Sequence, residues 1–200
     1  MTRSFTSMLL GLQYLGATLA GDEDLIRGLM RLPQETAPLL EGLPARLHSF
    51  AGSHSFEDCI FLAQGPLFGI ASESMLKVTE SSCTYTQVFH SLEFRHGPMS
   101  IAGPDTLLTF LMSESSYEAE LDLLEEMKKL GATVLAVANR FDDRGRRAAD
   151  FIVELGLTVP EYARPAAYTL AGQLYGVYNG LKKGLNPDSP RNLTRVVVLE

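Results

Sequence analysis

The chain has 200 residues, of which 46% are hydrophobic, 20% are charged and 8% are aromatic. This composition supports one packed domain of ordinary size and excludes collagen, coiled coil and intrinsic disorder. Lys and Arg number 17 against 24 Asp and Glu, which gives a formal net charge of -7. An acidic chain offers no basic surface to a nucleic-acid backbone, so we expect no nucleic-acid partner.

Two cysteines and an apolar N-terminal segment bear on the cellular compartment. Cys59 and Cys83 are the only cysteines, which indicates reduced thiols in a cytoplasmic protein rather than a disulfide framework. No motif surrounds Cys83, so we predict a buried core thiol there rather than a nucleophile. Residues 8–20 are similar to a secretory signal, but Gln13 and Tyr14 interrupt the apolar run, and a cytoplasmic helix is the preferred interpretation. No segment reaches the roughly 18 uninterrupted apolar residues of a membrane span.

The hydrophobic pattern predicts a helical arm followed by alternating strands and helices. Apolar residues at helical spacing indicate helices over residues 8–20, 23–30 and 36–50, and later over residues 69–81, 117–131 and 162–183. Short apolar runs indicate strands that begin near Asp58, Leu107, Thr133 and Phe151, with a loop over residues 141–147 and a strand-like C-terminal end. This alternation predicts a doubly wound α/β fold with a mainly parallel sheet. We divide the chain into a helical arm over residues 1–45 and an α/β domain over residues 46–200.

Two loops are candidates for ligand binding, because ligands of such sheets bind beyond the carboxyl ends of the strands. The first contains Gln64 and Gly65, and the second contains Ser113 and Ser115. Hydroxyls of the second loop can cap the following helix or hold an anion, and the sequence leaves both interpretations open. Neither loop matches a nucleotide-binding motif, and we expect no cofactor. The spacing of His and Cys residues gives no metal motif, so we expect no metal.

Charged residues on the helix after the first loop, and one histidine, are the candidates for chemistry. Glu73, Lys77 and Glu80 are spaced i, i+4 and i+7 and share one helix face. Taken alone, this triplet is more typical of a solvated salt-bridge ladder than of a site. His96 lies in a turn set by Gly97 and Pro98, where an imidazole can meet a ligand and exchange a proton near neutral pH.

Three segments together resemble the sugar isomerase (SIS) family. They are ASESMLKVTE at residues 71–80, LEFRHGP at residues 92–98 and PRNLTRVVVLE at residues 190–200. The resemblance covers about residues 55–200 and is to the second SIS domain of the isomerase half of glucosamine-6-phosphate synthases. The opening TRSFTS resembles the segment that leaves the first of two tandem SIS domains, so residues 1–45 are interpreted as the exit of such a domain.

The resemblance implies roles for individual residues. Glu80 would move a proton between C1 and C2 of an open-chain sugar phosphate, Lys77 would hold the developing negative charge, and His96 would assist ring opening in the active site of a neighbouring subunit. The residues expected to line the sugar phosphate are Gln64, Gly65, Ser113, Ser115, Thr2 and Arg195. Arg195 stands where the synthases carry a lysine that forms a Schiff base, and arginine cannot do this because it stays protonated.

These observations lead to a functional hypothesis and one alternative. We expect a cytoplasmic phosphosugar isomerase or amino-sugar-phosphate deaminase that acts on a hexose 6-phosphate, of the glucosamine 6-phosphate or fructose 6-phosphate type, and forms a homodimer or higher oligomer. The relatives' first SIS domain carries the main phosphate cradle, of which only the exit is present here. The alternative is therefore a non-catalytic sugar-phosphate-binding module, or an incomplete half of a double-SIS enzyme.

Overall fold

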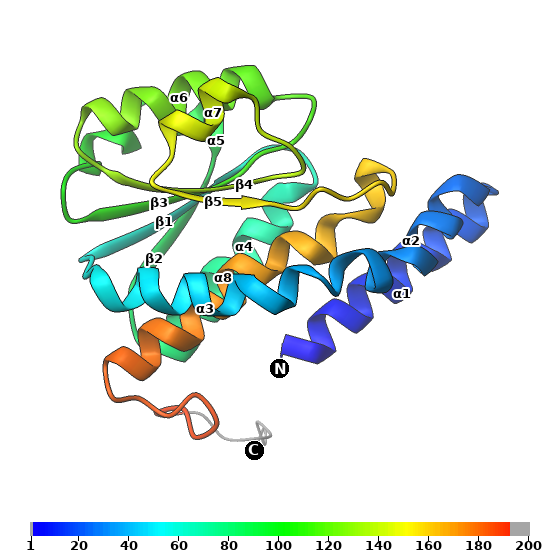
Figure 1. Ribbon diagram of the computed structural model, residues 1–200, viewed down its shortest axis with the longest axis horizontal. Coiled ribbons are helices and arrows are strands. Elements are labelled where there is room, and N and C mark those ends of the chain that lie inside the picture. The colour runs from blue at the N-terminus through cyan, green and yellow to red at the C-terminus, as the bar shows by residue number, and fades with distance from the viewer. Residues whose placement is uncertain (1, 193–200) are drawn as a thin grey trace, which may run out of the picture.

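The computed structural model describes residues 2–192, except the side chains of Thr2 and Arg3. Three helices precede a five-stranded parallel sheet and its connecting helices (Figure 1). The α-helices are α1 (Thr2–Ala20), α2 (Glu23–Thr36), α3 (Leu39–Ser53), α4 (Leu67–Ser82), α5 (Ser91–Phe94), α6 (Tyr117–Lys129), α7 (Asp143–Ala148) and α8 (Pro165–Lys182). Two 3₁₀-helices are η1 (Pro98–Ile101) and η2 (Glu161–Ala163). The strands are β1 (Asp58–Ala63), β2 (Tyr85–His90), β3 (Thr106–Leu111), β4 (Thr133–Ala138) and β5 (Phe151–Glu154).

The strands follow the order β2-β1-β3-β4-β5, and every neighbouring pair is parallel. Every residue of β3 is buried, because helices cover both faces of a parallel sheet. The strand order reverses between β1 and β3, so the loops that follow these two strands diverge at a topological switch point. Gln64 and Gly65 follow β1, and Ser113 and Ser115 follow β3, which places both predicted loops at this point.

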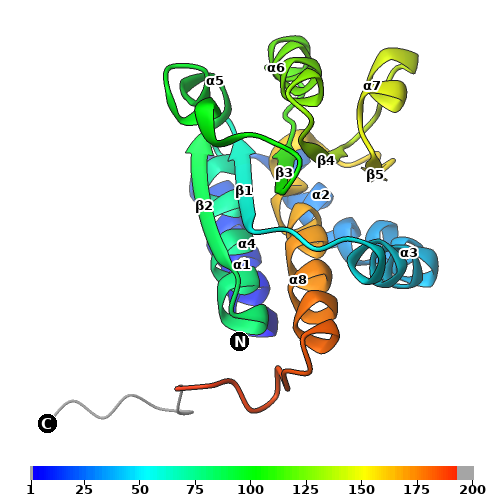
Figure 2. The ribbon, with the colours of Figure 1, turned by 90° about the vertical axis from the view of Figure 1, so that its left-hand side faces the viewer.

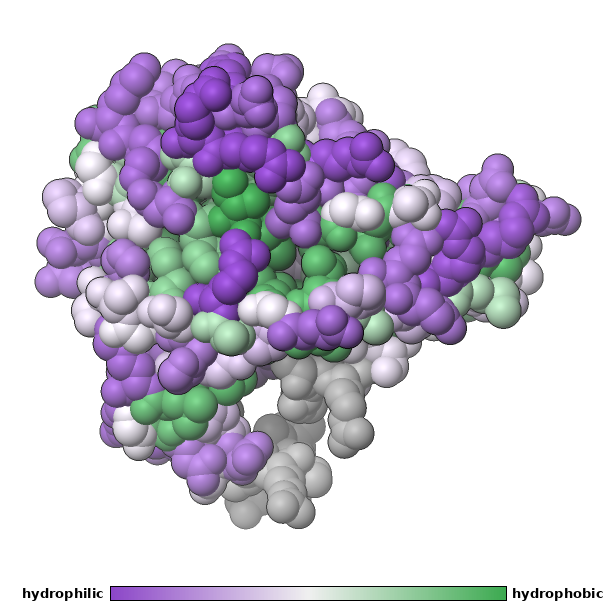
Figure 3. Space-filling model, in the orientation of Figure 1, coloured by the Kyte–Doolittle hydropathy of each residue, from purple (hydrophilic) through white to green (hydrophobic). Residues whose placement is uncertain are grey.

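The sheet has one hydrophobic core on each face. α3, α4 and α8 cover one face, and α5, α6 and α7 cover the other (Figures 1 and 2). On the side seen in Figure 3, polar side chains cover α6 and α7, and apolar side chains gather in a hollow between α3 and β5. Arg46 reaches across to the edge strand, donating a 2.7 Å hydrogen bond to the Ile152 carbonyl oxygen with its guanidinium over the Phe151 ring. The fold class predicted from the alternating pattern is confirmed.

Three local predictions were incomplete or wrong. β2 was not predicted, because this edge strand mixes polar and apolar residues and has no buried run. The segment predicted as a loop over residues 141–147 contains the short helix α7, whose N-cap Asp142 accepts a hydrogen bond from the Gly145 amide. Cys83 is exposed rather than buried, because it ends α4 in the left-handed conformation at φ 47°. The predicted C-terminal strand at residues 193–200 lies outside the described residues.

Among the described helices, α4 and α8 make the most extensive contact. Glycines at 172, 176 and 180 follow the i, i+4 spacing along the side of α8 that faces α4. A β-carbon at Gly172 would collide with Ser74, one at Gly180 would collide with the Ser81 carbonyl oxygen, and one at Gly176 would lie 3.1 Å from the Lys77 carbonyl oxygen. The missing side chains therefore let the two backbones approach each other directly.

The N-terminal helices attach to the sheet domain at a few defined points. Gln13 Nε2 donates to the Tyr162 carbonyl oxygen at 2.6 Å, and Gly28 of α2 leaves room for Pro160. Residue 45, the predicted domain boundary, lies within α3, which packs on α8; the division itself stays a prediction. Within the part of the chain that the structure describes, no helix combines the length and apolar character needed to cross a membrane.

A substitution of Gly180 by alanine tests the close contact of α4 and α8. We expect Gly180→Ala to lower the free energy of unfolding by about 1–3 kcal/mol, because the added methyl group displaces backbone rather than a flexible side chain. Urea unfolding followed by circular dichroism measures this change. The matched control is Gly42→Ala in α3, where the new methyl group meets nothing within 4 Å and should be neutral or stabilising. Equal effects of the two substitutions would contradict the interpretation.

Candidate active site

Glu73, Lys77 and Glu80 lie together on α4, and two of the three are buried. Lys77 Nζ is 2.5 Å from Glu80 Oε2 and 3.8 Å from Glu73 Oε1. The exposed fractions of the side chains are 7% for Lys77, 9% for Glu73 and 33% for Glu80. Exposed ladders do not bury their lysine, so the solvated interpretation of this triplet is wrong for Lys77 and Glu73. The arrangement is a buried ammonium with one carboxylate beneath it and another that reaches solvent.

Glu73 is the residue of this group for which no role was predicted. Burial raises its pKa, and the neighbouring Lys77 ammonium opposes that shift. Its Oε1 atom is buried and has no hydrogen-bond partner, as is also true of Ser74 Oγ on α4 and Gln173 Nε2 on α8. Buried polar atoms are nearly always paired, so the unpaired Glu73 oxygen beside Lys77 is an unusual feature of this group.

His96 lies at the opposite end of α4 from Glu80. α4 begins beside the carboxyl end of β1 and runs back toward the other edge of the sheet, where β2 starts (Figure 2). Leu67 and Glu80 are thus about 20 Å apart along the helix axis. His96 follows β2 and α5, at the carboxyl edge, and its side chain is exposed. One chain therefore does not bring His96 to the Lys77–Glu80 pair.

The two predicted binding loops also lie at the carboxyl edge, away from Glu80. Gly65 is exposed with φ 52°, and Gln64 is half-buried. In the other loop, the Ser113 amide donates to Glu120 and the Glu114 amide donates to Glu161, while the Ser113 hydroxyl contacts the hydroxyls of Ser115 and Ser116. Carboxylates of the chain itself thus occupy N–H groups that an anion would use.

Glu120 is a fully buried carboxyl that organises this edge. It accepts hydrogen bonds from the Ser91 hydroxyl, the Ser116 hydroxyl and the Ser113 amide. Burial raises its pKa to about 7, and the hydrogen bonds oppose the shift. Glu120 therefore connects two segments through hydrogen bonds. One is the segment between β2 and His96, and the other is the loop after β3. Its position on the apolar face of α6 gave no sign of this in the sequence.

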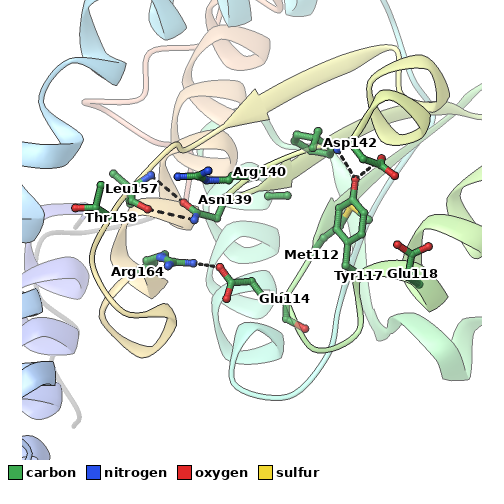
Figure 4. A pocket seen from close by; sticks show the side chains of 13 residues that line it. Met112, Glu114, Tyr117, Glu118, Asn139, Arg140, Asp142, Leu157, Thr158 and Arg164 are labelled. Atoms are coloured by element: carbon green, nitrogen blue, oxygen red, sulfur yellow. Dashed lines mark hydrogen bonds and ion pairs between the residues drawn. The ribbon is translucent and has the colours of Figure 1, made fainter.

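A cavity of about 700 Å³ opens at the carboxyl ends of β3 and β4 (Figure 4). Arg164 points to Glu114 across it, and Tyr117 contacts Asp142 at 3.0 Å on the far side. Arg140 lines the same cavity and directly follows Asn139 at the end of β4. Sequence reasoning missed both arginines, although the position of Arg140 just after a strand was a usable signal.

The remaining predicted residues are placed as follows. Thr2 is the first residue of α1, but its side chain is outside the described part, and Arg195 lies outside the described residues altogether. Among residues 2–192, no group of three His, Cys, Asp or Glu side chains is arranged to hold a metal ion. Cys59 is buried beside Tyr175, and burial raises the pKa of its thiol to about 11. The thiol is therefore a poor nucleophile.

Comparison with known proteins shows what this arrangement is similar to. No protein-family model matches the chain. The isomerizing glutamine–fructose-6-phosphate aminotransferase of Chlamydia abortus is 30% identical over 210 residues, which cover 100% of this chain and 34% of that protein. The chain thus spans about a third of the length of this curated relative.

Two solved structures are similar over most of the chain. Glucosamine-6-phosphate deaminase from Thermotoga maritima superposes with a TM-score of 0.76 at 27% identity, covering 100% of this chain and 57% of that one. The C-terminal domain of glucosamine-fructose-6-phosphate aminotransferase from Francisella tularensis has the same fold, with a TM-score of 0.68 at 20% identity and coverage of 82% and 45%.

These likenesses agree with the doubly wound α/β fold described above and relate it to domains of sugar-phosphate isomerases and deaminases. More particularly, the chain resembles the sugar isomerase (SIS) domain found in the isomerase half of glucosamine-6-phosphate synthase. The resemblance seen in the three sequence segments is confirmed.

The buried charges of α4 predict coupling between Lys77 and Glu73. We expect Lys77→Met to lower the free energy of unfolding by about 3 kcal/mol at pH 8, because it leaves the Glu73 carboxylate buried without its cation. The loss should be smaller at pH 5, because a raised pKa favours protonation of Glu73 as the pH falls. Adding Glu73→Gln should recover more than half of the loss in a double-mutant cycle measured by urea unfolding. Additive losses at both pH values would show that the two side chains do not interact.

The raised pKa of Glu120 predicts a defined pH dependence of stability. The folded state binds this proton more tightly than the unfolded state, so Glu120 lowers stability as pH rises from about 4.5 to about 7. The difference in unfolding free energy between wild type and Glu120→Gln should therefore fall across this window, by about 3 kcal/mol. Glu118→Gln, an exposed neighbour on α6, serves as the control and should follow wild type at every pH. A flat difference for Glu120→Gln would refute the shift.

Proposed function

We propose that this chain supplies the proton-transferring half of a sugar-phosphate isomerase or amino-sugar-phosphate deaminase site. The observation that carries the proposal is the buried Lys77 ammonium held between Glu73 and Glu80 on α4. The substrate class comes from the relatives, whose names refer to fructose 6-phosphate and glucosamine 6-phosphate. A hexose 6-phosphate of this type is the proposed partner, and the cytoplasm is the proposed location.

Glu80 is the proposed base, because its carboxylate is the member of the group that reaches solvent. It takes the proton from one of the carbons C1 and C2 of the open-chain sugar and returns it to the other. The electron pair of the broken C–H bond moves into an enediol or enolamine, which places negative charge on the neighbouring oxygen. The Lys77 ammonium, whose Nζ lies 2.5 Å from Glu80 Oε2, stabilises that charge. Glu73 holds Lys77 in position.

His96 would act on the substrate bound to a second chain. Within one chain it lies about a helix length from Glu80, far beyond the reach of one hexose phosphate. The predicted binding residues Gln64, Gly65, Ser113 and Ser115 are also about a helix length from Glu80. A substrate at Glu80 therefore needs phosphate-binding residues from another source. Such a source is a second chain or a further domain, which makes an oligomer part of the proposal.

The carboxyl-edge cavity favours one alternative. It is large enough for a monosaccharide phosphate and is lined by Arg140 and Arg164, so a sugar-phosphate-binding module without turnover would use it instead of α4. Thermal stabilisation by glucosamine 6-phosphate that Arg140→Ala removes and Glu80→Gln does not, with no proton exchange, would support this alternative.

Proton exchange in D₂O tests the role of Glu80. The chain is incubated with glucosamine 6-phosphate and, separately, with fructose 6-phosphate, and proton NMR follows deuterium entry at C1 or C2 together with ammonium release. We expect exchange in wild type and a loss of at least about 1,000-fold in Glu80→Gln, because the amide cannot accept the proton. Glu57→Gln, an exposed carboxylate at the same edge of the sheet, is the matched control. Exchange that persists in Glu80→Gln would eliminate the assignment, and ammonium would select the deaminase.

Mixing two inactive variants tests the second chain. Glu80→Gln and His96→Ala should each be inactive alone, whereas an equal mixture should regain about a quarter of wild-type activity. Half of the randomly mixed dimers are hybrids, and one of their two sites then combines the intact Glu80 with the intact His96. A mixture as inactive as its components would show that His96 does not act across chains.

A further inference from the structure

The segment that carries His96 is a short turn at the carboxyl edge of the sheet. α5 has only four residues, and His96 continues it, because its amide donates to the Glu93 carbonyl oxygen at 3.0 Å. The imidazole itself is exposed. An exposed side chain is placed by the backbone beneath it, so the position of this imidazole depends on what holds the turn.

Two side chains anchor the turn to α6, which lies beside α5 (Figure 2). At the start of the turn, the Ser91 hydroxyl donates to Glu120 Oε1 at 2.7 Å, and both residues are fully buried. At its end, Arg95 donates two hydrogen bonds, of 3.0 and 2.9 Å, to the Glu126 carboxylate. Between these anchors, Phe94 is fully buried in the core beneath α6. The whole turn is thus attached to one helix.

The two anchors differ in burial and therefore in strength. The side chains of Arg95 and Glu126 are 31% and 45% exposed, and ion pairs that water reaches contribute little. Glu120 is shielded from water, where a hydrogen bond to a carboxylate is stronger than one between neutral groups. Its Oε2 atom accepts from the Ser116 hydroxyl at 2.8 Å, which fixes the direction of the carboxyl group. Glu120 is thus the stronger anchor.

α6 is a firm support for this anchor. On its inner side, Leu121, Leu124 and Met127 are fully buried in the core. On its outer side, Arg144 of α7 lies 2.8 Å from a carboxylate oxygen of Glu125. Because close-packed interiors resist displacement, a group that is fixed to α6 is also fixed relative to the sheet.

We propose that Glu120 is a positioning residue for His96 and acts through the Ser91 hydroxyl on the turn that carries the imidazole. Glu120 is fully buried, so it does not touch the substrate. The inference rests on the proposed function, in which His96 assists the opening of the sugar ring.

Ring opening depends on an accurately placed proton carrier. In fructose 6-phosphate, the bond between C2 and the ring oxygen breaks, the proton of the C2 hydroxyl group leaves, and the ring oxygen gains a proton. The carrier must lie within hydrogen-bond reach of these atoms. A displacement of the His96 turn therefore slows this step, whereas proton transfer by Glu80 on an open chain does not need the turn.

Ser91→Ala tests the positioning, because it removes the hydrogen bond and keeps both Glu120 and His96. With fructose 6-phosphate in D₂O at about pH 8, we expect Ser91→Ala to lower kcat for deuterium entry by at least about 10-fold and to leave KM within about 2-fold, because a misplaced group slows the reaction without removing a substrate contact. With 5-deoxyfructose 6-phosphate, which lacks the hydroxyl that closes the ring, the rate should stay within about 2-fold of wild type. His96→Ala should show the same difference between the two substrates.

Ser116→Ala is the matched control, because it also removes a hydrogen bond to Glu120, but from the loop after β3 rather than from the turn. Amide hydrogen exchange measured by mass spectrometry gives a readout that does not depend on the reaction. Amides of residues 91–98 should exchange at least about 5-fold faster in Ser91→Ala than in wild type. Ser116→Ala should match wild type in this exchange and in turnover, and circular dichroism verifies that both variants fold.

Four outcomes would overturn the proposal. Unchanged amide exchange in Ser91→Ala would show that the turn is held without this hydrogen bond. Turnover of fructose 6-phosphate equal to that of an active wild type, or equal losses on both substrates, would show that ring opening does not depend on it. Equal effects of Ser91→Ala and Ser116→Ala would indicate a general loss of stability. Faster amide exchange in Ser91→Ala together with an inactive wild type would support the anchoring of the turn and contradict only the proposed reaction.

Discussion

The contact between α4 and α8 is the constraint on which the candidate site depends. Three glycines on α8 let the backbone of α4 lie against it, and an added β-carbon would collide with α4 at Gly172 and Gly180 and be tightly placed at Gly176. This approach buries the flank of α4 that carries Ser74, Lys77 and Val78, so a lysine that an isolated helix would extend into water is held at 7% exposure. An ammonium placed in this way must be paired, because desolvating an unpaired charge is costly. Glu73 and Glu80 provide that pairing.

The same helix also separates the polar features of the chain into two regions. α4 connects the carboxyl edge of the sheet, where its strands end, to the opposite edge, where β2 begins. Loops rich in hydroxyl groups, the cavity with Arg164 and the exposed His96 belong to the first region, whereas the charged group around Lys77 belongs to the second. Because a helix is rigid over this length, no small rearrangement within one chain can merge the two regions. Any chemistry that uses both Glu80 and His96 must therefore be intermolecular.

The sequence predicted what depends on local patterning. The runs at β1, β3 and β4 are mostly apolar because both of their faces are buried. Together with the alternation of strands and helices, this pattern indicated a parallel sheet. The edge strand β2 was not predicted, because it is not fully buried and its composition is mixed. The exposure of Cys83 was also not predicted, because it results from the left-handed conformation that ends α4 rather than from the residue type. The hydrophobic pattern thus predicts elements that are buried on both sides, but it does not predict edge strands or the conformation of helix ends.

The burial of Lys77 could not be predicted from its own segment, and the reason is physical. The spacing of Glu73, Lys77 and Glu80 is the same in a surface ladder and in a buried site. What distinguishes the two is a partner about a hundred residues later in the chain, the glycine face of α8, which looks in sequence like a weak helix rather than a close-packing surface. Once the partner is in place, the carboxylate most enclosed by the contact, Glu73, has its pKa raised, while Glu80 at the open end stays accessible. Burial thus divides two chemically identical side chains into one that holds the lysine and one that can meet a substrate.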